Sequence, residues 1–322
     1  MSAHPQQALR AQDYGFFGPG SPSWKVWSSP TSLIGFQRAV VLEHFDPFLA
    51  AAVADMRGIY TNPGRRLDRT LAYFLTVAVA DGRTATEASR LLMRVHAKVQ
   101  GIEPISGTPY SANSPESQLW IHVTGWHSVL KCYELYGPGP LSEREERRYW
   151  EECAVAAELQ TCKPADVPRS RDGVRAYFEA VRPRLCTSER AHEGMHYLLR
   201  TPRANAGWAF WGISRILAPA TVASLPRWMR VIGGFDQGML ADAITPPLAR
   251  IAMQFGQWPV LKVAALRYSA PNTARIMRAH HAGGVPANAR TVTPAECRAR
   301  TPGLHVEDVP SRVATPEAAT AH

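Results

Sequence analysis

Residues 84–101 read TATEASRLLMRVHAKVQG, and this stretch decides the fold class. Thr84 and Glu87 stand three residues apart, which is the spacing of a capping box at the start of a helix. Apolar residues recur at helical spacing and predict one inward-facing stripe: Ala88, Leu92, Val95 and Val99. Gly101 is a natural end for such a helix. The stretch therefore predicts a helix from 84 to about 100 with one buried face.

The next stretch, residues 114–136, repeats the helical pattern with different signals. Ser114 is a good N-cap and Pro115 suits the first helical position. A Gly-Pro-Gly-Pro run at 137–140 ends the segment. The predicted inward residues follow at helical spacing: Leu119, Val123, Trp126, Leu130 and Tyr133.

The rest of the chain follows the same pattern, and five or more residues of clean β alternation do not occur in it. Ser142 and Glu145 form another capping box. The further predicted helices cover 32–41, 48–58, 65–80, 145–159, 172–182, 187–200, 203–217, 221–232 and 245–254. These patterns predict an all-α fold with one helical domain at 31–283. Residues 1–30 are expected to form an irregular arm, and 284–322 a flexible, disordered tail without a core-forming pattern.

Two histidines fall on the predicted apolar faces. His96 lies four residues after Leu92, and His122 lies one residue before Val123. One interpretation is a pair of buried neutral histidines that are satisfied by hydrogen bonds. The other is that they are ligands, because a neutral imidazole in a dry helical pocket suits haem iron or another metal. The pattern of residues leaves haem and a bare metal ion both open.

A third histidine pair, His192 and His196, belongs to an H-E-x-x-H sequence, which is the pattern of zinc proteases. Such enzymes need a third ligand further along the chain. No glutamate occurs between Glu193 and Glu296, and Pro202 stands where the extended pattern has its third histidine. The sequence therefore does not favour a zinc protease.

Charge and composition limit the partners and the compartment. The net charge of +9 is spread without a long Lys/Arg run, which argues against nucleic acid and leaves a membrane surface or cofactor propionates as anionic partners. The five cysteines form no C-x-x-C pair, which favours a reducing compartment. No signal-peptide pattern opens the chain, and the longest apolar run, 71–80, is shorter than the roughly 20 residues of a membrane span. We expect a cytoplasmic protein without a transmembrane segment.

Residues 62–70, NPGRRLDRT, carry an R-x-x-[KR]-T pattern at Arg66, Arg69 and Thr70. This stretch resembles the catalytic-domain family shared by rubber oxygenase (latex-clearing protein) and the ER-bound oxygenase of mycophenolic acid biosynthesis. The other matching blocks, in chain order, are His96, Val99 and Gly101 in H-x-x-V-x-G; Tyr110 to Ala112; Pro115; Trp120, Ile121, His122 and Thr124 in W-[VI]-H-x-T; Leu141 to Glu143; and Tyr149 to Glu151. The resemblance runs from about residue 17 to about residue 233.

The resemblance implies haem b, with its iron, in an α-helical, partly globin-like core. It makes His96 the proximal iron ligand and His122 a supporting or alternative ligand. Among the other histidines of the chain, His192 and His196 rank third as candidate ligands. The resemblance places Arg66, Arg69 and Thr70 on the distal or propionate side. Arginine can pair with propionates bidentately, and a threonine hydroxyl can offer a hydrogen bond to bound oxygen.

One departure concerns the proton-handling group. Many relatives carry a His-Pro pair after the first helix, whereas this chain has Asp46-Pro47, with His44 two residues earlier. If that histidine handles protons in relatives, Asp46 or Glu43 would have to serve here.

The sequence thus leads to the hypothesis of a haem b-dependent oxygenase. It would act with O₂ on an apolar small molecule of the olefinic or isoprenoid kind. Two alternatives remain open: a haem-binding sensor or peroxidase-like protein, and a non-enzymatic helical scaffold with buried histidines. A visible absorption spectrum of the purified protein separates the last alternative from the others.

Overall fold

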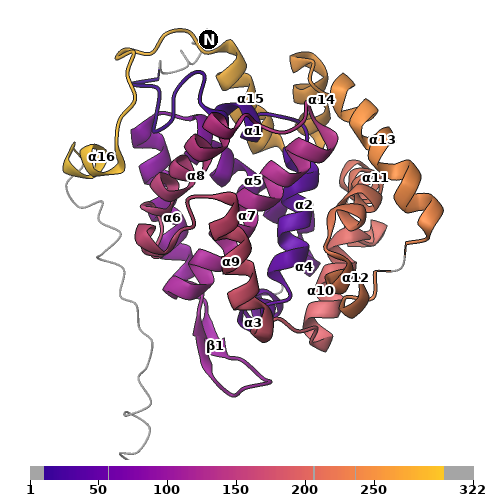
Figure 1. Ribbon diagram of the computed structural model, residues 1–322. Coiled ribbons are helices and arrows are strands. Elements are labelled where there is room, and N and C mark those ends of the chain that lie inside the picture. The colour runs from indigo at the N-terminus through magenta and orange to yellow at the C-terminus, as the bar shows by residue number, and fades with distance from the viewer. Residues whose placement is uncertain (1–10, 57, 206, 236, 301–322) are drawn as a thin grey trace, which may run out of the picture.

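The structure is a computed structural model that describes residues 11–56, 58–205, 207–235 and 237–300, and helices fill most of this length (Figure 1). The sheet structure of these residues is a single antiparallel hairpin of β1 (Gln100–Ile102) and β2 (Pro109–Ser111). The predicted all-α class is confirmed. None of the described helices is long and apolar enough to cross a membrane.

In chain order the helices are α1 (Pro22–Trp27), α2 (Ser32–Glu43), α3 (Pro47–Met56), α4 (Gly58–Thr61), α5 (Pro63–Val79), α6 (Gly82–His96), α7 (Pro115–Tyr136), α8 (Glu143–Ala157), α9 (Arg171–Val181), α10 (Glu189–Leu199), α11 (Trp208–Ser224), α12 (Arg227–Ile232), α13 (Met239–Phe255), α14 (Pro259–Ser269), α15 (Pro271–Ala282) and α16 (Pro294–Arg300). Most predicted helices are present with ends shifted by a few residues. The sequence patterns did not predict the helices α1, α4, α14, α15 and α16.

The long helix α7 runs through the middle of the molecule and packs along α2 (Figure 1). Its start follows the predicted signals, because the Ser114 side chain accepts the backbone N–H of Ser117 and Pro115 occupies the first turn. The two helices approach closely at Gly35 of α2. A Cβ atom added there would lie 2.6 Å from the Cα atom of Val129. Glycine is therefore the residue that allows this crossing.

Aromatic rings fill the main core between α1, α5 and α7. Trp27 stacks on Phe74 with ring centres 5.3 Å apart and meets Trp126 edge-on at 5.4 Å. Phe17 joins the same group through Trp126 at 6.0 Å. Residues of the predicted N-terminal arm are thus part of the core, because large aromatic side chains bury much apolar surface.

The helix predicted from residue 84 differs from the structure at both ends. It begins at Gly82, because the Asp81 side chain caps it by accepting the backbone N–H of Thr84. It ends at His96, and the chain then turns into the hairpin, so Gly101 pairs with Tyr110 rather than capping the helix.

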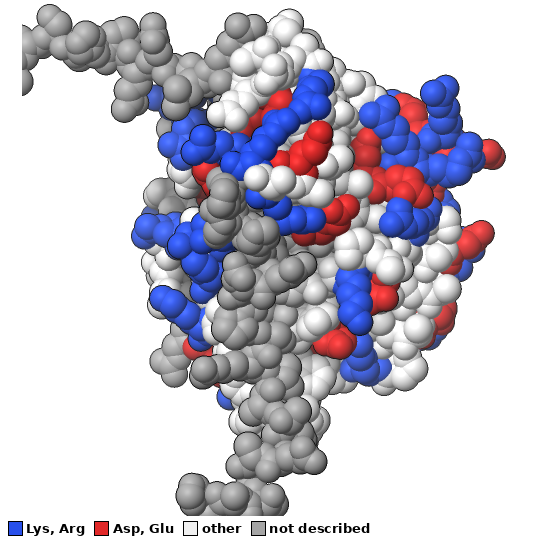
Figure 2. Space-filling model, turned by 90° about the vertical axis from the view of Figure 1, so that its left-hand side faces the viewer, with Lys and Arg blue, Asp and Glu red and all other residues white. Residues whose placement is uncertain are grey.

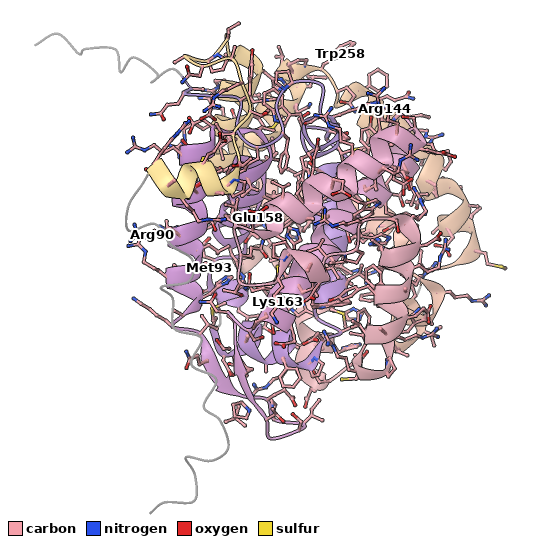
Figure 3. The ribbon with its side chains drawn as sticks, turned by 60° about the vertical axis from the view of Figure 1, so that its left-hand side comes forward. Arg90, Met93, Arg144, Glu158, Lys163 and Trp258 are labelled. Carbon is pink, nitrogen blue, oxygen red and sulfur yellow. The ribbon has the colours of Figure 1, made fainter. Side chains whose placement is uncertain are left out.

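The buried face of α6 is also rotated from the predicted stripe. Ala85, Ser89 and Met93 are buried, whereas Val95 is 51% exposed. Figure 3 shows Arg90 extending outward from the same helix. The prediction that Val95 faces inward is wrong. Small residues let α6 pack closely on its neighbours, and this favours the Ala85 face over the more apolar one.

The tail predicted from residue 284 contains structure in its described part. Helix α16 packs against α6, with Val292 and Cys297 buried beside Gly82. Thr293 caps the helix through a reciprocal pair of hydrogen bonds with Glu296. The described part of the predicted tail therefore contains a short capped helix, preceded by the buried side chain of Val292, while 301–322 lie outside the described residues.

Surface charge is mixed rather than striped on the face drawn in Figure 2, where Lys and Arg side chains alternate with Asp and Glu. Arg171 of α9, for example, bonds to both Glu134 and Glu146. Such mixing is consistent with the prediction from the spread of charge along the sequence.

Candidate functional site

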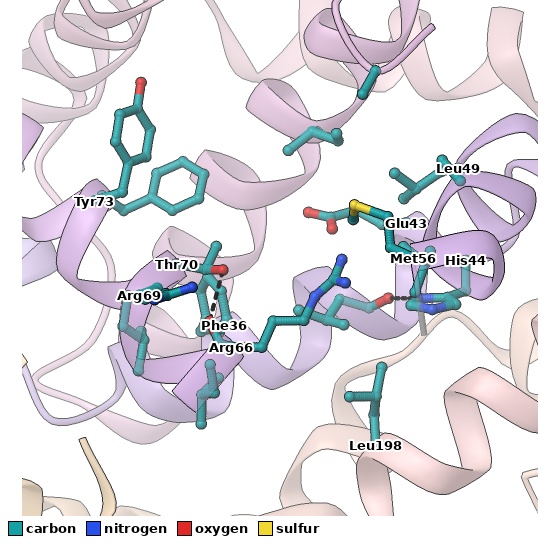
Figure 4. Close-up of a pocket in the computed structure, with 18 of the residues that line it drawn as sticks. Phe36, Glu43, His44, Leu49, Met56, Arg66, Arg69, Thr70, Tyr73 and Leu198 are labelled. Atoms are coloured by element: carbon teal, nitrogen blue, oxygen red, sulfur yellow. Dashed lines mark hydrogen bonds between the residues drawn. The ribbon is translucent and has the colours of Figure 1, made fainter. Parts of the chain in front are cut away.

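A cavity of about 260 Å³, here called the first cavity, lies between α2, α3, α5, α7 and α11, beside the end of α6 and β2 (Figure 4). Most of its wall is apolar, as with Phe36 and Val40 of α2 and Phe74 of α5. Polar side chains interrupt this wall, and those that can ionise or that lie beside such a group include Glu43, His44, Arg66, Arg69, Thr70, His96 and Gln118. An apolar cavity with few convergent polar groups is the usual form of a small-molecule site.

Helix α5 supplies three of the polar residues from one face. Asn62 caps the helix, and Arg66, Arg69 and Thr70 follow at positions that share a face. Thr70 Oγ1 donates to the carbonyl oxygen of Arg66 at 3.0 Å, and Figure 4 marks this bond. Arg69 lies at the rim of the cavity. The three predicted residues thus line one cavity, with Arg66 and Thr70 half-buried and Arg69 exposed.

Arg66 faces Glu43 across the cavity, and Figure 4 shows the guanidinium and the carboxyl pointing toward one another. Burial lowers the pKa of Arg66, and the charge of Glu43 opposes that effect. Burial raises the pKa of Glu43 to about 8, although the Thr124 hydroxyl donates to it at 3.5 Å and Arg66 lowers it. At neutral pH this carboxyl therefore holds its proton inside the cavity.

His96 reaches the cavity from the last residue of α6. Burial, together with the charge of Arg66, lowers its pKa to about 4, so the imidazole is neutral at pH 7. Its Nδ1 atom lies 3.1 Å from Nε2 of Gln118, which also donates to the carbonyl oxygen of Ala112. Among the residues that the structure describes, Nε2 of His96 has no hydrogen-bond partner. This nitrogen is the one that a ligand in the cavity can reach.

His44 is a second neutral histidine in the cavity wall. Its Nδ1–H donates to the carbonyl oxygen of Val40 at 2.6 Å, and burial lowers its pKa to about 4. Its Nε2 atom is buried without a hydrogen-bond partner in the described part of the chain. A histidine held through Nδ1 with a bare Nε2 has the tautomer that metal ligands use.

His122 lies outside the first cavity, although it is one of the most buried histidines. Its Nε2–H donates to the carbonyl oxygen of Cys153 in α8 at 2.7 Å, and its ring lies 5.7 Å from that of Trp126. The structure does not bring His122 and His96 into one site. Its position suits the interpretation of a buried neutral histidine, because burial lowers its pKa to about 4.

The H-E-x-x-H residues also lie away from the cavity. The rings of His192 and His196 of α10 lie tilted to one another with centres 4.2 Å apart, and Nε2 of His196 donates to the carbonyl oxygen of Gly233. No group of three or more metal-ligating side chains occurs among the described residues.

The two candidate proton-handling carboxyls, Asp46 and Glu43, lie in different surroundings, and only Glu43 lines the first cavity. Asp46 caps α3 by accepting the backbone N–H groups of Phe48 and Leu49, and it pairs with Arg184 at 3.3 Å. It does not line the first cavity, whereas Glu43 does. Of the pair, only Glu43 is positioned to exchange a proton with a molecule in the cavity.

A comparison with family models places residues 24–258 in the family described as ER-bound oxygenase mpaB/B'/Rubber oxygenase, catalytic domain. The chain belongs to this family. The match covers all the helices that line the first cavity, and it indicates an oxidoreductase of the oxygenase type. Comparisons with curated proteins and with solved structures found no significant match.

Sequence reasoning missed two of the cavity residues. His44 was noted only as a neighbour of Asp46, although it lies on the same helical face as Val40, four residues earlier. Gln118 was not singled out at all, since an amide side chain near a helix start has no distinctive pattern. For His44, the signal that could have found it is the apolar spacing of α2, which places it on the face with Phe36 and Val40.

Proposed function

We propose that the protein is a haem b-dependent oxygenase that acts with O₂ on an apolar small molecule. The observation that carries the proposal is the first cavity, in which a chain of this oxygenase family gathers a neutral histidine, a buried cation and a protonated carboxyl within apolar walls. Most of the wall surface is apolar, so a substrate of the olefinic or isoprenoid kind would gain free energy on leaving water there.

The donor set suits haem. His96 would bind the iron, and Arg66 and Arg69 would pair with the propionates, since guanidinium groups match carboxylates bidentately. Binding through Nε2 requires a hydrogen on Nδ1, whereas Gln118 donates to Nδ1 here. The amide of Gln118 would have to turn its oxygen toward Nδ1, at the cost of its bond to Ala112. His44, whose tautomer already suits a metal, is the alternative ligand.

When bound, haem would supply the activation of O₂, and the side chains of this protein would orient the substrate, exclude water and hold a proton. The apolar wall would exclude water and orient the substrate. Arg66 would donate hydrogen bonds inside the cavity, whereas Thr70 already donates its one hydroxyl hydrogen to the carbonyl oxygen of Arg66. Glu43 would hold a proton at its carboxyl until it is needed, because its pKa of about 8 keeps it protonated near neutral pH. We further propose a reducing compartment such as the cytoplasm, since no disulfide links the five cysteines.

The experiment compares three matched variants, His96→Gln, His44→Gln and His122→Gln, with the wild type. The visible spectrum and haem content of each purified protein are measured, followed by O₂ consumption with apolar alkenes. We expect His96→Gln to lose haem and activity while His122→Gln keeps both, because His122 lies outside the cavity.

The other outcomes are equally informative. Loss of haem in His44→Gln alone moves the iron ligand to His44 and leaves the oxygenase proposal standing. A wild-type protein that binds haem but consumes no O₂ with any alkene would point to a sensor. A wild-type protein that never takes up haem refutes the proposal.

A further inference from the structure

A second cavity of about 370 Å³ lies on the opposite side of α2 from the first cavity. Val40, Glu43 and His44 of α2 line the first cavity, whereas Arg38 and Leu42 line the second. The other walls come from α7, α9 and the start of α12. The proposed oxygenase reaction uses no residue of this second cavity.

The unusual feature of the second cavity is a buried guanidinium. Arg38 is only 2% exposed, and its bonds go to neutral groups. Nη1 donates to the Ser128 hydroxyl at 2.7 Å and lies 3.4 Å from Nδ1 of His127, while Nε donates to the carbonyl oxygen of Ser224 at 3.3 Å. No carboxylate within the described ranges lies within ion-pair distance of it. Arginine cannot shed its charge, so a buried unpaired guanidinium is costly.

Two residues near Arg38, His127 and Lys131, also favour the binding of an anion in this cavity. His127 accepts from Arg38 at Nδ1, which leaves its hydrogen on Nε2 as a further donor. Burial and then the charges of Arg38, Lys131 and Arg171 hold the pKa of His127 well below its usual range. Lys131 lines the same cavity and forms no ion pair with any carboxylate that the structure describes.

The other charged residues at this cavity already have partners. Arg171 pairs with Glu134 at the cavity wall, and Arg182 lies 3.7 Å from Glu179. Arg175 is largely exposed and pairs with Asp172 at 2.8 Å. The lining therefore carries five cations and two carboxylates, a net charge of +3. Since Arg171, Arg175 and Arg182 have carboxylate partners, the cations without a carboxylate partner among the described residues are Arg38 and Lys131.

The remaining wall of the second cavity is apolar and partly aromatic. It includes Leu42, Leu130, Phe178, Leu185, Trp228 and Met229. An inorganic anion would leave this surface without a partner, whereas a neutral apolar molecule would leave the guanidinium without one. The complementary ligand carries one planar anionic group and an apolar body.

We propose that the second cavity binds a small organic monocarboxylate, with its carboxylate at Arg38 and Lys131 and its apolar body against Phe178 and the leucines. A carboxylate is the anion whose planar shape matches the guanidinium fork. Pairing with Arg38 would neutralise the buried charge, and this supplies a reason for the site to favour an acid over the corresponding alcohol.

The test titrates the full-length protein with sodium hexanoate, 1-hexanol and inorganic phosphate at pH 7 by calorimetry. Hexanoate is expected to bind at least tenfold more tightly than either of the others, because only it satisfies both halves of the cavity. Equal binding of hexanol would overturn the anionic part of the proposal, and equal binding of phosphate would overturn the apolar part. The absence of hexanoate binding would overturn the whole.

Variants locate the site. Arg38→Met replaces the charged side chain by an uncharged one, and we expect it to weaken the binding of hexanoate at least tenfold. Arg175→Met, at the same cavity but already paired, and Arg66→Met, in the first cavity, should each stay within twofold of the wild type. Hexanoate binding that is lost in Arg66→Met but kept in Arg38→Met would place the acid in the first cavity and refute the proposal.

Folding and haem are checked separately. Circular dichroism tests whether Arg38→Met is folded; if it is not, Lys131→Met replaces it, with an expected weakening of at least threefold, and unchanged binding in that variant refutes the proposal. The haem content of Arg38→Met should equal that of the wild type. Because hexanoate binding is measured without turnover, the second cavity can succeed or fail independently of the oxygenase proposal.

Discussion

Replacing Glu43 by glutamine tests the electrostatics of the first cavity directly. The substitution keeps the size of the side chain and an oxygen that can accept from Thr124, but it removes the ionisable group. Burial raises the pKa of Glu43 from 4.5 to about 8. The folded protein therefore keeps this proton over a pH range in which the unfolded chain has lost it.

The sign and size of the effect follow from linkage. A group with a raised pKa stabilises the fold fully below its unfolded pKa, and this contribution is lost as pH rises toward the folded value. Each unit of difference corresponds to about 1.4 kcal/mol. Between pH 6 and pH 8 the wild type should lose about 2 kcal/mol of unfolding free energy that Glu43→Gln does not lose.

The assay is urea unfolding at pH 6, 7, 8 and 9, with Glu143→Gln as a control at a carboxyl that is 95% exposed. The control should follow the wild type at every pH, whereas Glu43→Gln should become more stable than the wild type as pH rises. Parallel curves for the wild type and Glu43→Gln would refute a buried, protonated Glu43. They would also remove its proposed role in proton handling.

Three further predictions test the scaffold. Gly35→Ala should cost about 2 kcal/mol in urea unfolding, because its Cβ would lie 2.6 Å from the backbone of α7, while Gly212→Ala, which meets open space, should stabilise by up to about 1 kcal/mol. Asp68→Ala should cost about 2–4 kcal/mol and increase amide exchange in α15, since its buried carboxylate accepts the first backbone N–H groups of that helix. The depressed pKa of His122, about 4, should make unfolding free energy fall by up to about 3 kcal/mol as pH drops from 6.5 to 4. His122→Gln should remove that share of the fall, while His44 and His96, whose pKa values are also about 4, keep theirs.

The sequence predicted the fold class because local signals act within a few residues. The capping box of Ser142 and Glu145 is present with both of its hydrogen bonds, and Ser114 with Pro115 begins α7 where expected. The predicted gap between residues 217 and 221 and the predicted helix start at 245 are wrong, because proline lies inside both helices. Pro219 lies inside α11, and the pair at 246–247 lies inside α13. The remainder of each helix packs well enough to offset the lost backbone bonds, which no local pattern reveals.

The candidate site was predictable only in part, because spacing along one helix is a local signal and contacts between distant segments are not. Arg66 and Thr70 share a helical face, so their placement in one cavity follows from spacing once that face is known. The helical stripe that was meant to place His96 was rotated, since Val95 is exposed. Which of two apolar faces is buried depends on how closely the neighbouring helix approaches. Glu43 and Gln118 enter the cavity through contacts between distant segments, and spacing along the chain cannot show these.

Helix α2 explains why buried charge can persist on both sides of one element. Its close crossing with α7 at Gly35 fixes the helix, so the side chains it carries cannot relax toward solvent. Burial of Glu43 raises the pKa of its carboxyl, so this group keeps a proton and is neutral near pH 7. Arg38 has no such option, because a guanidinium stays charged at any pH the fold tolerates. The same rigid helix therefore creates a neutral acid in the first cavity and an unmet cation in the second, and the second requires an anion from outside the chain.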